Sequence, residues 1–331
     1  RGHFTRNRAP TATVVRPATQ FATGDRLKAR LRAADSLAMA TSMQAPSLNP
    51  VAALVDGTLD LVPLPQAYIR IREIVEDPGA SLRAISEVVT SDPALTGRVL
   101  RLANSAYLAL VSRIDTIDHA VRILGLSQVH DIALATSAVG SMSRLKTDLF
   151  DIYDFWRTSV YTAVCARHLA AECGVQSPQR MFIAGLMHNI GNLIIAHELP
   201  QAYRDCAQMA HESSQPYHVL QRRVLGFDYA DVGAELMRQW NLPMPLVQPV
   251  ALHTHAIGEL PAAEQPLAAV LHVAAVTARA AAWESAESEP VPGYDPTAVD
   301  ITGVNDEMIA ELMERVAGEV AEFIAILMPG G

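Results

Sequence analysis

The 331-residue sequence predicts an all-α fold, and three of its features support that prediction. Apolar residues recur at helical spacing, helix start and stop residues flank many of these runs, and no run alternates with period two for long enough to argue a sheet. Ala, Leu, Met, Arg and Glu are abundant, and these residues favour helix. Half of the residues are hydrophobic and 18% are charged, which is typical of a globular chain with a large core.

The first 60 residues are predicted to hold a tail, one helix and a linker. Residues 1–24 carry four arginines, no acid and no apolar periodicity, so we expect a disordered basic tail. Within residues 25–60, Leu27 and Leu31 recur on one face of a predicted helix that ends near residue 43. A polar, proline-containing linker follows it.

Residues 61–149 carry the clearest helix boundaries. Asp92 is a good N-cap, and Pro93 suits the first helical position, where its missing N–H costs nothing. Leu95, Val99 and Leu102 then fall at i, i+4 and i+7. We expect these three side chains to be buried.

Three neighbouring helices of the same region follow similar rules. One begins just after the prolines at positions 63 and 65 and ends at Asp77-Pro78-Gly79. Thr116 is placed to cap a second helix, which closes at Gly125, and Ser127 to cap a third.

The second half continues as helices around residues 155–169 and 180–196 and onward to Trp240. A loop near residues 288–296, rich in Glu, Pro and Gly, separates a last helix that completes the bundle within residues 259–331. Its apolar stripe consists of Ile309, Leu312, Val316, Val320, Phe323 and Leu327. Packing of this stripe against the bundle is the expected use, and docking on a second copy is the alternative.

Charge is distributed unevenly along the chain. The segment through Arg32 holds eight Lys or Arg residues and one acid, a net charge of +7, whereas the remainder carries −16. Binding along a nucleic-acid backbone requires a basic face, so an acidic body argues against that function. The basic segment is expected to be a solvated terminus, and contact with an anionic partner is the alternative.

The sequence shows no membrane segment or signal-peptide core. Its longest uncharged stretches, such as residues 181–197 and 239–258, are interrupted by polar residues or prolines. The cysteines, Cys165, Cys173 and Cys206, form no CxxC pair, and an odd number suits no closed disulfide framework. We therefore expect a cytoplasmic protein.

Common enzyme signatures are missing. The sequence has no Walker A loop, GxGxxG fingerprint, GxSxG elbow or CxxC zinc pair. Its one suggestive set is centred on histidines: His188 within the apolar stretch FIAGLMHNIGNLII, and His253 and His255 after a proline-rich helix start. A lone histidine in an apolar helix is more often a satisfied core residue than a ligand, so these residues alone define no site.

Several blocks together resemble the HDOD domain family. They are residues 61–108 and the segments TIDHAVRILGLSQVHDIAL, DFWRTSVYTAVCARHLA, FIAGLMHNIGNLII, GFDYADVGAELMRQWNLP and ALHTHA, in this order. The resemblance covers residues 61–258 and implies an N-terminal helical subregion (61–149) and an HD-like subregion (150–258). HDOD domains are similar in fold to HD phosphohydrolases and are viewed as regulatory modules of bacterial signalling.

The resemblance also implies where a metal site would lie, and this sequence departs from the catalytic pattern there. Catalytic HD enzymes hold one or two metal ions with a first His, a His-Asp pair, further His residues and a late Asp. The matching positions in this chain are Thr158, His188, Asn189, Tyr229, His253, His255 and Ala275. Asn192 stands where a lysine often follows the glycine of the His-Asp motif.

These replacements predict a degenerate site without metal, cofactor or catalytic residue. Divalent metals in hydrolytic sites need carboxylates to offset their charge and position water. We therefore expect a non-catalytic regulatory module that contacts other signalling proteins, with self-association left open. The rival prediction is a metal-dependent phosphohydrolase or cyclic-dinucleotide phosphodiesterase, which would bind a divalent metal weakly through His188, His253 and His255.

Overall fold

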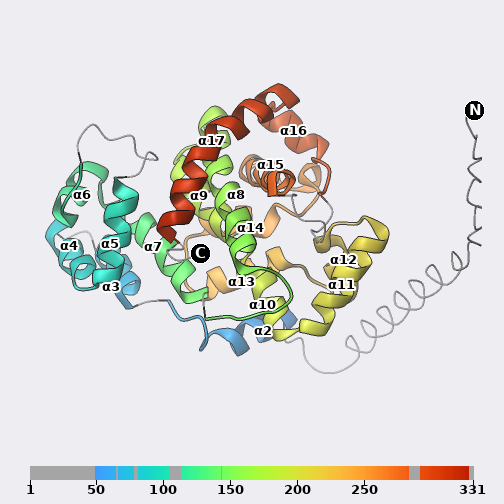
Figure 1. Cartoon of the computed structure of the whole chain (residues 1–331), viewed down its shortest axis with the longest axis horizontal. Coiled ribbons are helices and arrows are strands. Elements are labelled where there is room, and N and C mark those ends of the chain that lie inside the picture. Colours follow the sequence, from blue (N-terminus) through green and yellow to red (C-terminus); the bar gives the residue numbers. More distant parts are fainter. Residues whose placement is uncertain are drawn as a thin grey trace, which may run out of the picture.

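A computed structural model describes residues 49–64, 66–77, 81–104, 113–142, 144–282 and 291–327, and these form helices without any β-strand (Figure 1). The helices are α2 (Pro50–Thr58), α3 (Gln66–Glu76), α4 (Leu82–Thr90), α5 (Pro93–Ala103), α6 (Ile117–Leu124), α7 (Leu126–Met142), α8 (Ile152–Glu172), α9 (Pro178–Met187), α10 (Ile190–Glu198), α11 (Pro200–Ser213), α12 (Tyr217–Leu225), α13 (Tyr229–Gln239), α14 (Met244–Leu252), the 3-10 turn η2 (Ile257–Glu259), α15 (Gln265–Ala282), α16 (Pro296–Thr302) and α17 (Asp306–Leu327). The all-α prediction is confirmed. The predicted tail and the helix expected at residues 25–43 lie outside the described residues.

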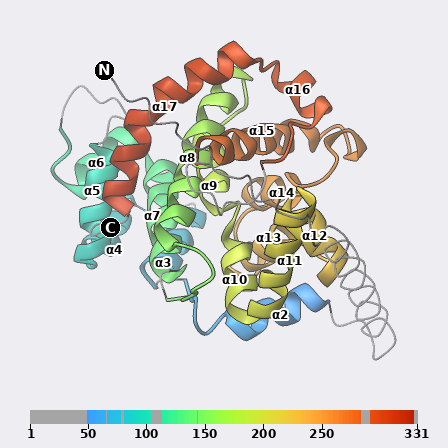
Figure 2. The same cartoon turned by 45° about the vertical axis from the view of Figure 1, so that its right-hand side comes forward.

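The helices gather into two groups that are joined by α7 (Figures 1 and 2). Helices α3 to α6 form the N-terminal subregion with α7, and α7 also packs against α9. We call residues 150–331 the HD-like body, because α15 and α17 both pack on α8. None of the described helices combines the length and apolar character needed to cross a membrane.

Local capping explains the helix starts in the N-terminal subregion. Asp92 Oδ1 accepts hydrogen bonds from the backbone N–H groups of Ala94 (2.9 Å) and Leu95 (3.0 Å), as its N-cap assignment predicts. Thr116 Oγ1 accepts from the N–H of His119 at 3.2 Å. Leu95, Val99 and Leu102 are all buried, which confirms the predicted core face.

The predicted start of α7 is wrong by two residues. The helix begins at Leu126, so Ser127 lies inside it rather than at its N-cap. Val129 N donates to the carbonyl of Gly125 at 3.3 Å, and Gly125 has a φ of 82°. This one glycine ends α6 and opens α7, because its lack of a side chain permits the left-handed φ.

Two segments fasten the groups together. Helix α2 lies apart from α3 and packs against α10 and α13 (Figures 1 and 2). The indole Nε1 of Trp240, just beyond α13, donates to Val62 O at 3.2 Å, and Arg72 donates to Trp240 O at 3.0 Å. Helix α17 runs along α8 and reaches α5.

The last helix packs on the bundle as its stripe predicts. Five of the six expected stripe residues are buried and Ile309 is partly buried. The ring of Phe323 lies 4.7 Å from that of Phe182 in α9, measured between ring centroids. Packing within the chain is thus the use that the structure shows for this stripe.

Candidate functional site

A small, partly open cavity of about 40 Å³ lies where α8, α12, α13, α14 and α15 meet the junction of α9 and α10. Its lining residues are Thr158, His188, His218, Tyr229, His253, Thr254, His272, Ala275, Val276, Arg279 and Pro292. Five of the seven positions expected from the HD pattern therefore converge on one cavity, and Asn189 and His255 are the two that do not line it. Because one water molecule needs about 10–15 Å³ of such space, the cavity holds at most a few waters.

Two histidines of the expected set, His188 and His253, meet edge to face, with ring centroids 5.6 Å apart. Each ring donates its Nδ1–H to a backbone carbonyl three residues earlier, Gly185 O at 2.7 Å and Val250 O at 2.8 Å. A carbonyl only accepts, so Nδ1 carries the proton and Nε2 keeps its lone pair. Burial lowers the pKa of His188 to about 4 and holds the pKa of His253 well below its usual value. Both rings are therefore neutral at pH 7.

Tyr229 stands where the HD pattern has a further histidine, and it changes what His253 can do. Its hydroxyl lies 3.3 Å from His253 Nε2, and because this nitrogen has no proton, the hydroxyl is the donor. Tyr229 reaches this place because α10 and α13 touch through their backbones: a Cβ on Gly191 would lie 1.9 Å from Tyr229 O. The lone pair that a metal would use on His253 is thus engaged by a tyrosine.

Asn189 belongs to a row of amides beside the cavity. Asn192 Nδ2 donates to Asn189 Oδ1 at 2.6 Å, and Gln221 Nε2 donates to Asn192 Oδ1 at 2.7 Å. Gln221 Oε1 then accepts from the backbone N–H of Tyr229 at 2.9 Å. Asn192 and Gln221 therefore tie α10 to α12 and α13, and Asn189 accepts the bond at the end of this row, which is a structural task.

His255 lies in a second polar network, centred on Arg222 of α12. The guanidinium of Arg222 lies 2.8 Å from Asp228 Oδ2 and from Thr254 Oγ1, and 3.1 Å from His255 Nδ1. Thr254 Oγ1 donates to the same Asp228 oxygen at 2.8 Å. Asp228 also caps α13 through the N–H groups of residues 230 and 231. The completely buried carboxylate of Asp228 is thus committed to Arg222, Thr254 and the cap.

The cavity also contains two histidines that the sequence reasoning did not select. His272 donates from Nδ1 to His253 O at 2.9 Å and accepts at Nε2 from the backbone N–H of Asp295 at 2.9 Å. Both of its nitrogens are therefore occupied as a neutral ring. Burial, and next the charge of Arg222, lower the pKa of His218 to about 4.

Arg279 is the third residue that was missed, and it brings positive charge to the cavity lining. Burial is the main cause of the lowered pKa of His188, and the hydrogen bond to Gly185 O opposes it. The charge of Arg279 lowers this pKa further. His272, Ala275 and Arg279 fall at i, i+3 and i+7 along α15, so they share one helix face. Helical spacing counted from the expected Ala275 position would have found both neighbours.

The lining residues do not suit a divalent metal. They offer imidazoles, hydroxyls and one guanidinium, and no carboxylate is among those that the structure describes. Over the whole described part of the chain, no group of three or more His, Cys, Asp or Glu side chains is arranged to hold a metal ion. Neutral ligands beside a fixed cation leave the charge of a divalent ion uncompensated, which is unfavourable in a buried cavity.

Comparisons with solved structures place this arrangement among known folds. A candidate phosphohydrolase from Shewanella amazonensis SB2B is 27% identical, with a TM-score of 0.65 over 83% of this chain and 98% of that one. An HDOD domain protein of unknown function from Geobacter sulfurreducens is 20% identical, with a TM-score of 0.67 over 86% and 100%. A candidate signal transduction protein from Marinobacter aquaeolei VT8 is 21% identical, with a TM-score of 0.63 over 94% and 67%.

Sequence comparison points the same way. An uncharacterized protein of Treponema pallidum (strain Nichols) is 28% identical over 229 residues, which cover 69% of this chain and 44% of that protein. The chain thus spans less than half the length of this curated relative. The sequence model of the HDOD domain matches residues 61–256, more than half of the chain. The chain belongs to the HDOD domain family.

Proposed function

We propose that this chain is a non-catalytic signal-transduction module that acts through contacts with other signalling proteins. The observation that carries the proposal is the lining of the HD-like cavity. Two neutral histidines, His188 and His253, meet there beside the Tyr229 hydroxyl and the Arg279 cation, and no carboxylate is among the described lining residues.

The chemistry of hydrolysis explains why this lining matters. A phosphoester hydrolase needs an activated water molecule, which a metal ion or a general base supplies. An imidazole whose pKa is about 4, as in His188, is a weak base at pH 7. The nearby Asp228 carboxylate is bound by Arg222 and Thr254, so it is not free to take up a proton from water.

A metal-dependent phosphohydrolase or cyclic-dinucleotide phosphodiesterase is the second candidate. It is favoured by the way His188 and His253 donate Nδ1–H to carbonyls, because histidines that bind metals are commonly oriented by such bonds. One structural relative is also named as a candidate phosphohydrolase. His255, the third ligand of this hypothesis, bonds to Arg222 outside the cavity, which weakens the candidate.

Metal analysis combined with an activity assay distinguishes the two candidates. The full chain is purified without chelators, its Mn, Fe and Zn contents are measured, and hydrolysis of bis(p-nitrophenyl) phosphate is followed with each metal added. We expect metal far below one ion per chain and no hydrolysis above the metal-only control. Near-stoichiometric Mn or Fe that His188→Ala removes, together with hydrolysis by the parent, would establish the enzyme instead.

A double variant that restores two metal ligands to the cavity provides the converse test. Tyr229→His with Ala275→Asp restores an imidazole and a carboxylate at two cavity-lining positions. We expect this variant to retain more zinc or manganese than the parent, because the carboxylate offsets the charge of the ion. Equal metal content in both proteins would show that ligand loss is not what limits metal binding.

We also infer a cytoplasmic location. The three cysteines are free thiols, and Cys165 and Cys206 are buried. Burial raises the pKa of both thiols to about 12, so they stay protonated and unreactive at neutral pH. Free cysteines support a reducing compartment, and alkylation of the unfolded protein taken from the native host checks their redox state.

A further inference from the structure

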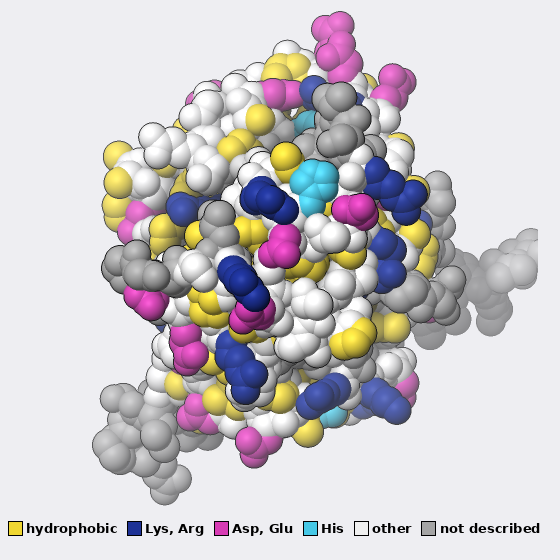
Figure 3. Space-filling model, turned by 90° about the vertical axis from the view of Figure 1, so that its left-hand side faces the viewer, with side chains coloured by type: hydrophobic (Ala, Val, Ile, Leu, Met, Phe, Trp, Pro, Cys, Tyr) yellow, Lys and Arg dark blue, Asp and Glu magenta, His cyan; other side chains and the backbone are white. Residues whose placement is uncertain are grey.

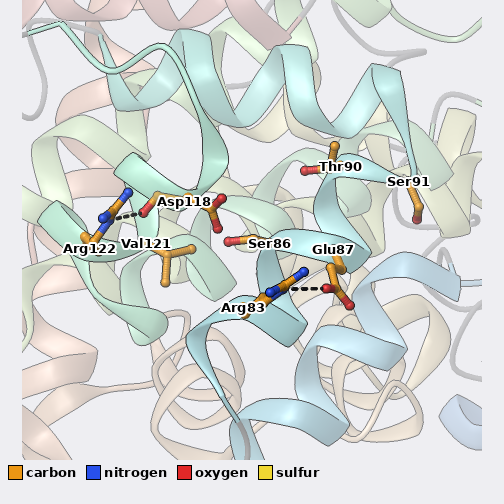
Figure 4. Close-up of a pocket in the computed structure, with 8 residues that line it drawn as sticks. All are labelled: Arg83, Ser86, Glu87, Thr90, Ser91, Asp118, Val121 and Arg122. Carbon is orange, nitrogen blue, oxygen red and sulfur yellow. Dashed lines mark hydrogen bonds and ion pairs between the residues drawn. The ribbon is translucent and has the colours of Figure 1, made fainter.

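An open groove of about 770 Å³ lies between α4 and α6 of the N-terminal subregion (Figure 4). Its lining residues are Arg83, Ser86, Glu87, Thr90, Ser91, Asp118, Val121 and Arg122. The first five come from α4 and its C-cap, and the last three from α6. The groove is thus walled by two helices and is far larger than the histidine-lined cavity.

Each wall of the groove carries one cation and one anion, four residues apart. On α4, Arg83 Nε lies 3.0 Å from Glu87 Oε1, and these side chains are 85% and 67% exposed. On α6, Arg122 Nε donates to the backbone carbonyl of Asp118 at 3.3 Å, so the Asp118 carboxylate is not consumed by that bond (Figure 4). The described lining of the groove is therefore neutral overall, and its charged groups face water.

The surrounding surface differs in charge from the remainder of the folded chain. Residues 61–149 contain nine Lys or Arg and nine Asp or Glu, whereas residues 150–331 contain nine and 22. Basic and acidic side chains are interspersed over the face of the molecule that carries the N-terminal subregion (Figure 3). A contact between two copies through this neutral face avoids the repulsion that a contact through the acidic residues 150–331 would bring.

We propose that the groove is a self-association surface whose occupant is the same groove of a second copy. A twofold contact pairs each residue with its counterpart reciprocally, so a surface with opposite charges at matched spacing complements itself. A twofold axis that crosses the groove sets Arg83 of one copy opposite Glu87 of the second copy. The same axis sets Asp118 opposite the second copy's Arg122, which gives four intermolecular ion pairs.

The expected contact is weak and sensitive to salt. Exposed ion pairs contribute little individually and are screened by dissolved ions. The groove and the HD-like cavity share no described lining residue, so self-association does not depend on whether that cavity is catalytic.

Sedimentation equilibrium of the full chain tests the proposal with two complementary variants. Arg83→Glu with Arg122→Glu makes the groove acidic, and Glu87→Arg with Asp118→Arg makes it basic. We expect the parent to dimerise at low salt, with a dissociation constant at least fivefold higher at 300 mM salt. Each variant alone should dimerise at least tenfold more weakly, and an equimolar mixture of the two should restore the parent affinity.

A matched control separates the groove from net charge. Arg101→Glu with Arg113→Glu changes the net charge by the same amount at exposed positions of the same subregion, outside the groove. We expect it to dimerise like the parent to within about twofold, and circular dichroism to show all variants folded. A parent that stays monomeric at low salt, a mixture that fails to associate, or a control as weak as the acidic groove variant would overturn the proposal.

Discussion

The N-terminal subregion and the HD-like body bury different kinds of polar side chain. Among the described residues, the buried polar side chains of the N-terminal subregion are hydroxyls: Ser86, Thr136, Ser137 and Ser141. The HD-like body also buries imidazoles, amides and a carboxylate: His188, Asn189, Asn192, Gln221, Asp228 and His253. A buried hydroxyl can be satisfied by its own helix, as Thr136 is by Ile132 O at 3.0 Å. The Gln221 amide and the Asp228 carboxylate instead take partners from other helices, Asn192 and Arg222 respectively.

This difference explains why the polar residues around the HD-like cavity matter for stability independently of any catalytic role. The amide row from Asn189 to Gln221 and the network around Arg222 and Asp228 hold α10, α12, α13 and α14 in register. Removing one member leaves its buried partner unsatisfied, which is costly whether or not the site is catalytic. The polar interior of the HD-like body is therefore explained by packing, while no charged side chain is fully buried among the described residues of the N-terminal subregion.

The largest expected effect is at the backbone contact that positions Tyr229. Gly191→Ala places a Cβ 1.9 Å from Tyr229 O, and neither backbone can move without separating α10 from α13. Overpacking a core costs about 1–3 kcal/mol and occasionally more, and we expect this variant to reach about 4 kcal/mol or to fail to fold. Urea unfolding of the purified chain measures it.

A glycine in the other group provides the control. At Gly97 in α5 an added Cβ would meet only the Arg101 side chain, at an ordinary 3.6 Å. Because alanine favours helix over glycine by about 1 kcal/mol, Gly97→Ala should leave stability unchanged or raise it slightly. Similar losses in both variants would mean that the contact at Gly191 is looser than the structure indicates.

The next prediction removes the buried carboxylate. Asp228→Ala leaves Arg222 and Thr254 without their shared acceptor and removes the cap of α13. Arg222 is 32% exposed, so the expected cost comes from the lost cap, about 0.5–2 kcal/mol, and the lost charged hydrogen bonds, about 1.5–3 kcal/mol. Arg222→Ala should cost less if the Asp228 carboxylate is held by its remaining partners. Urea unfolding compares the two, and a loss below about 1 kcal/mol for Asp228→Ala would contradict a stabilising role for the network.

Apolar packing decides stability in the N-terminal subregion. Leu102 is 2% exposed, so Leu102→Ala should destabilise the chain by about 2–5 kcal/mol, as core truncations do. Ile123→Ala, at a side chain that is 52% exposed, should stay within about 0.5 kcal/mol of the parent. Thermal unfolding followed by circular dichroism compares them, and equal effects would place both side chains in the same environment.

Local chemistry made most helix boundaries predictable, and long-range packing decided the rest. The caps at Asp92 and Thr116 involve residues two or three apart, so the sequence alone indicates them. The start of α7 was mispredicted because a serine is only a potential cap, whereas Gly125 both ends and starts a helix. Whether one glycine both ends a helix and starts the next depends on its backbone conformation, and residue spacing does not predict that conformation.

The candidate site was predictable only through the family pattern. That pattern brought Thr158 and Ala275 together with the histidines, although they lie on α8 and α15. It misplaced His255, because an adjacent Arg222 from another helix draws this ring into a second network. Interhelix contacts of this kind decide which side chains of a turn face a cavity. The local sequence of the turn does not predict them.

The smallest expected effect is a pH dependence that buried histidines of the HD-like body supply. Burial holds the pKa of His188 and of His218 at about 4, against 6.5 for an ordinary histidine. Between about pH 4 and pH 6.5 the unfolded chain therefore binds protons that the folded chain does not. The free energy of unfolding falls as the pH is lowered through this window. From pH 7 to pH 5 each such ring accounts for about 2 kcal/mol.

Two variants at the cavity test this linkage. His188→Gln removes one titrating ring, so its loss of stability from pH 7 to pH 5 should be about 2 kcal/mol smaller than that of the parent. Thr158→Val changes the same cavity without a titrating group, and it should keep the pH dependence of the parent while lowering stability equally at both pH values. Urea unfolding at pH 5, 6 and 7 measures all three proteins. If His188→Gln loses as much stability as the parent on acidification, His188 binds protons equally in both states. The cavity would then be wetter than its burial implies, and the contrast between the two parts of the molecule would weaken.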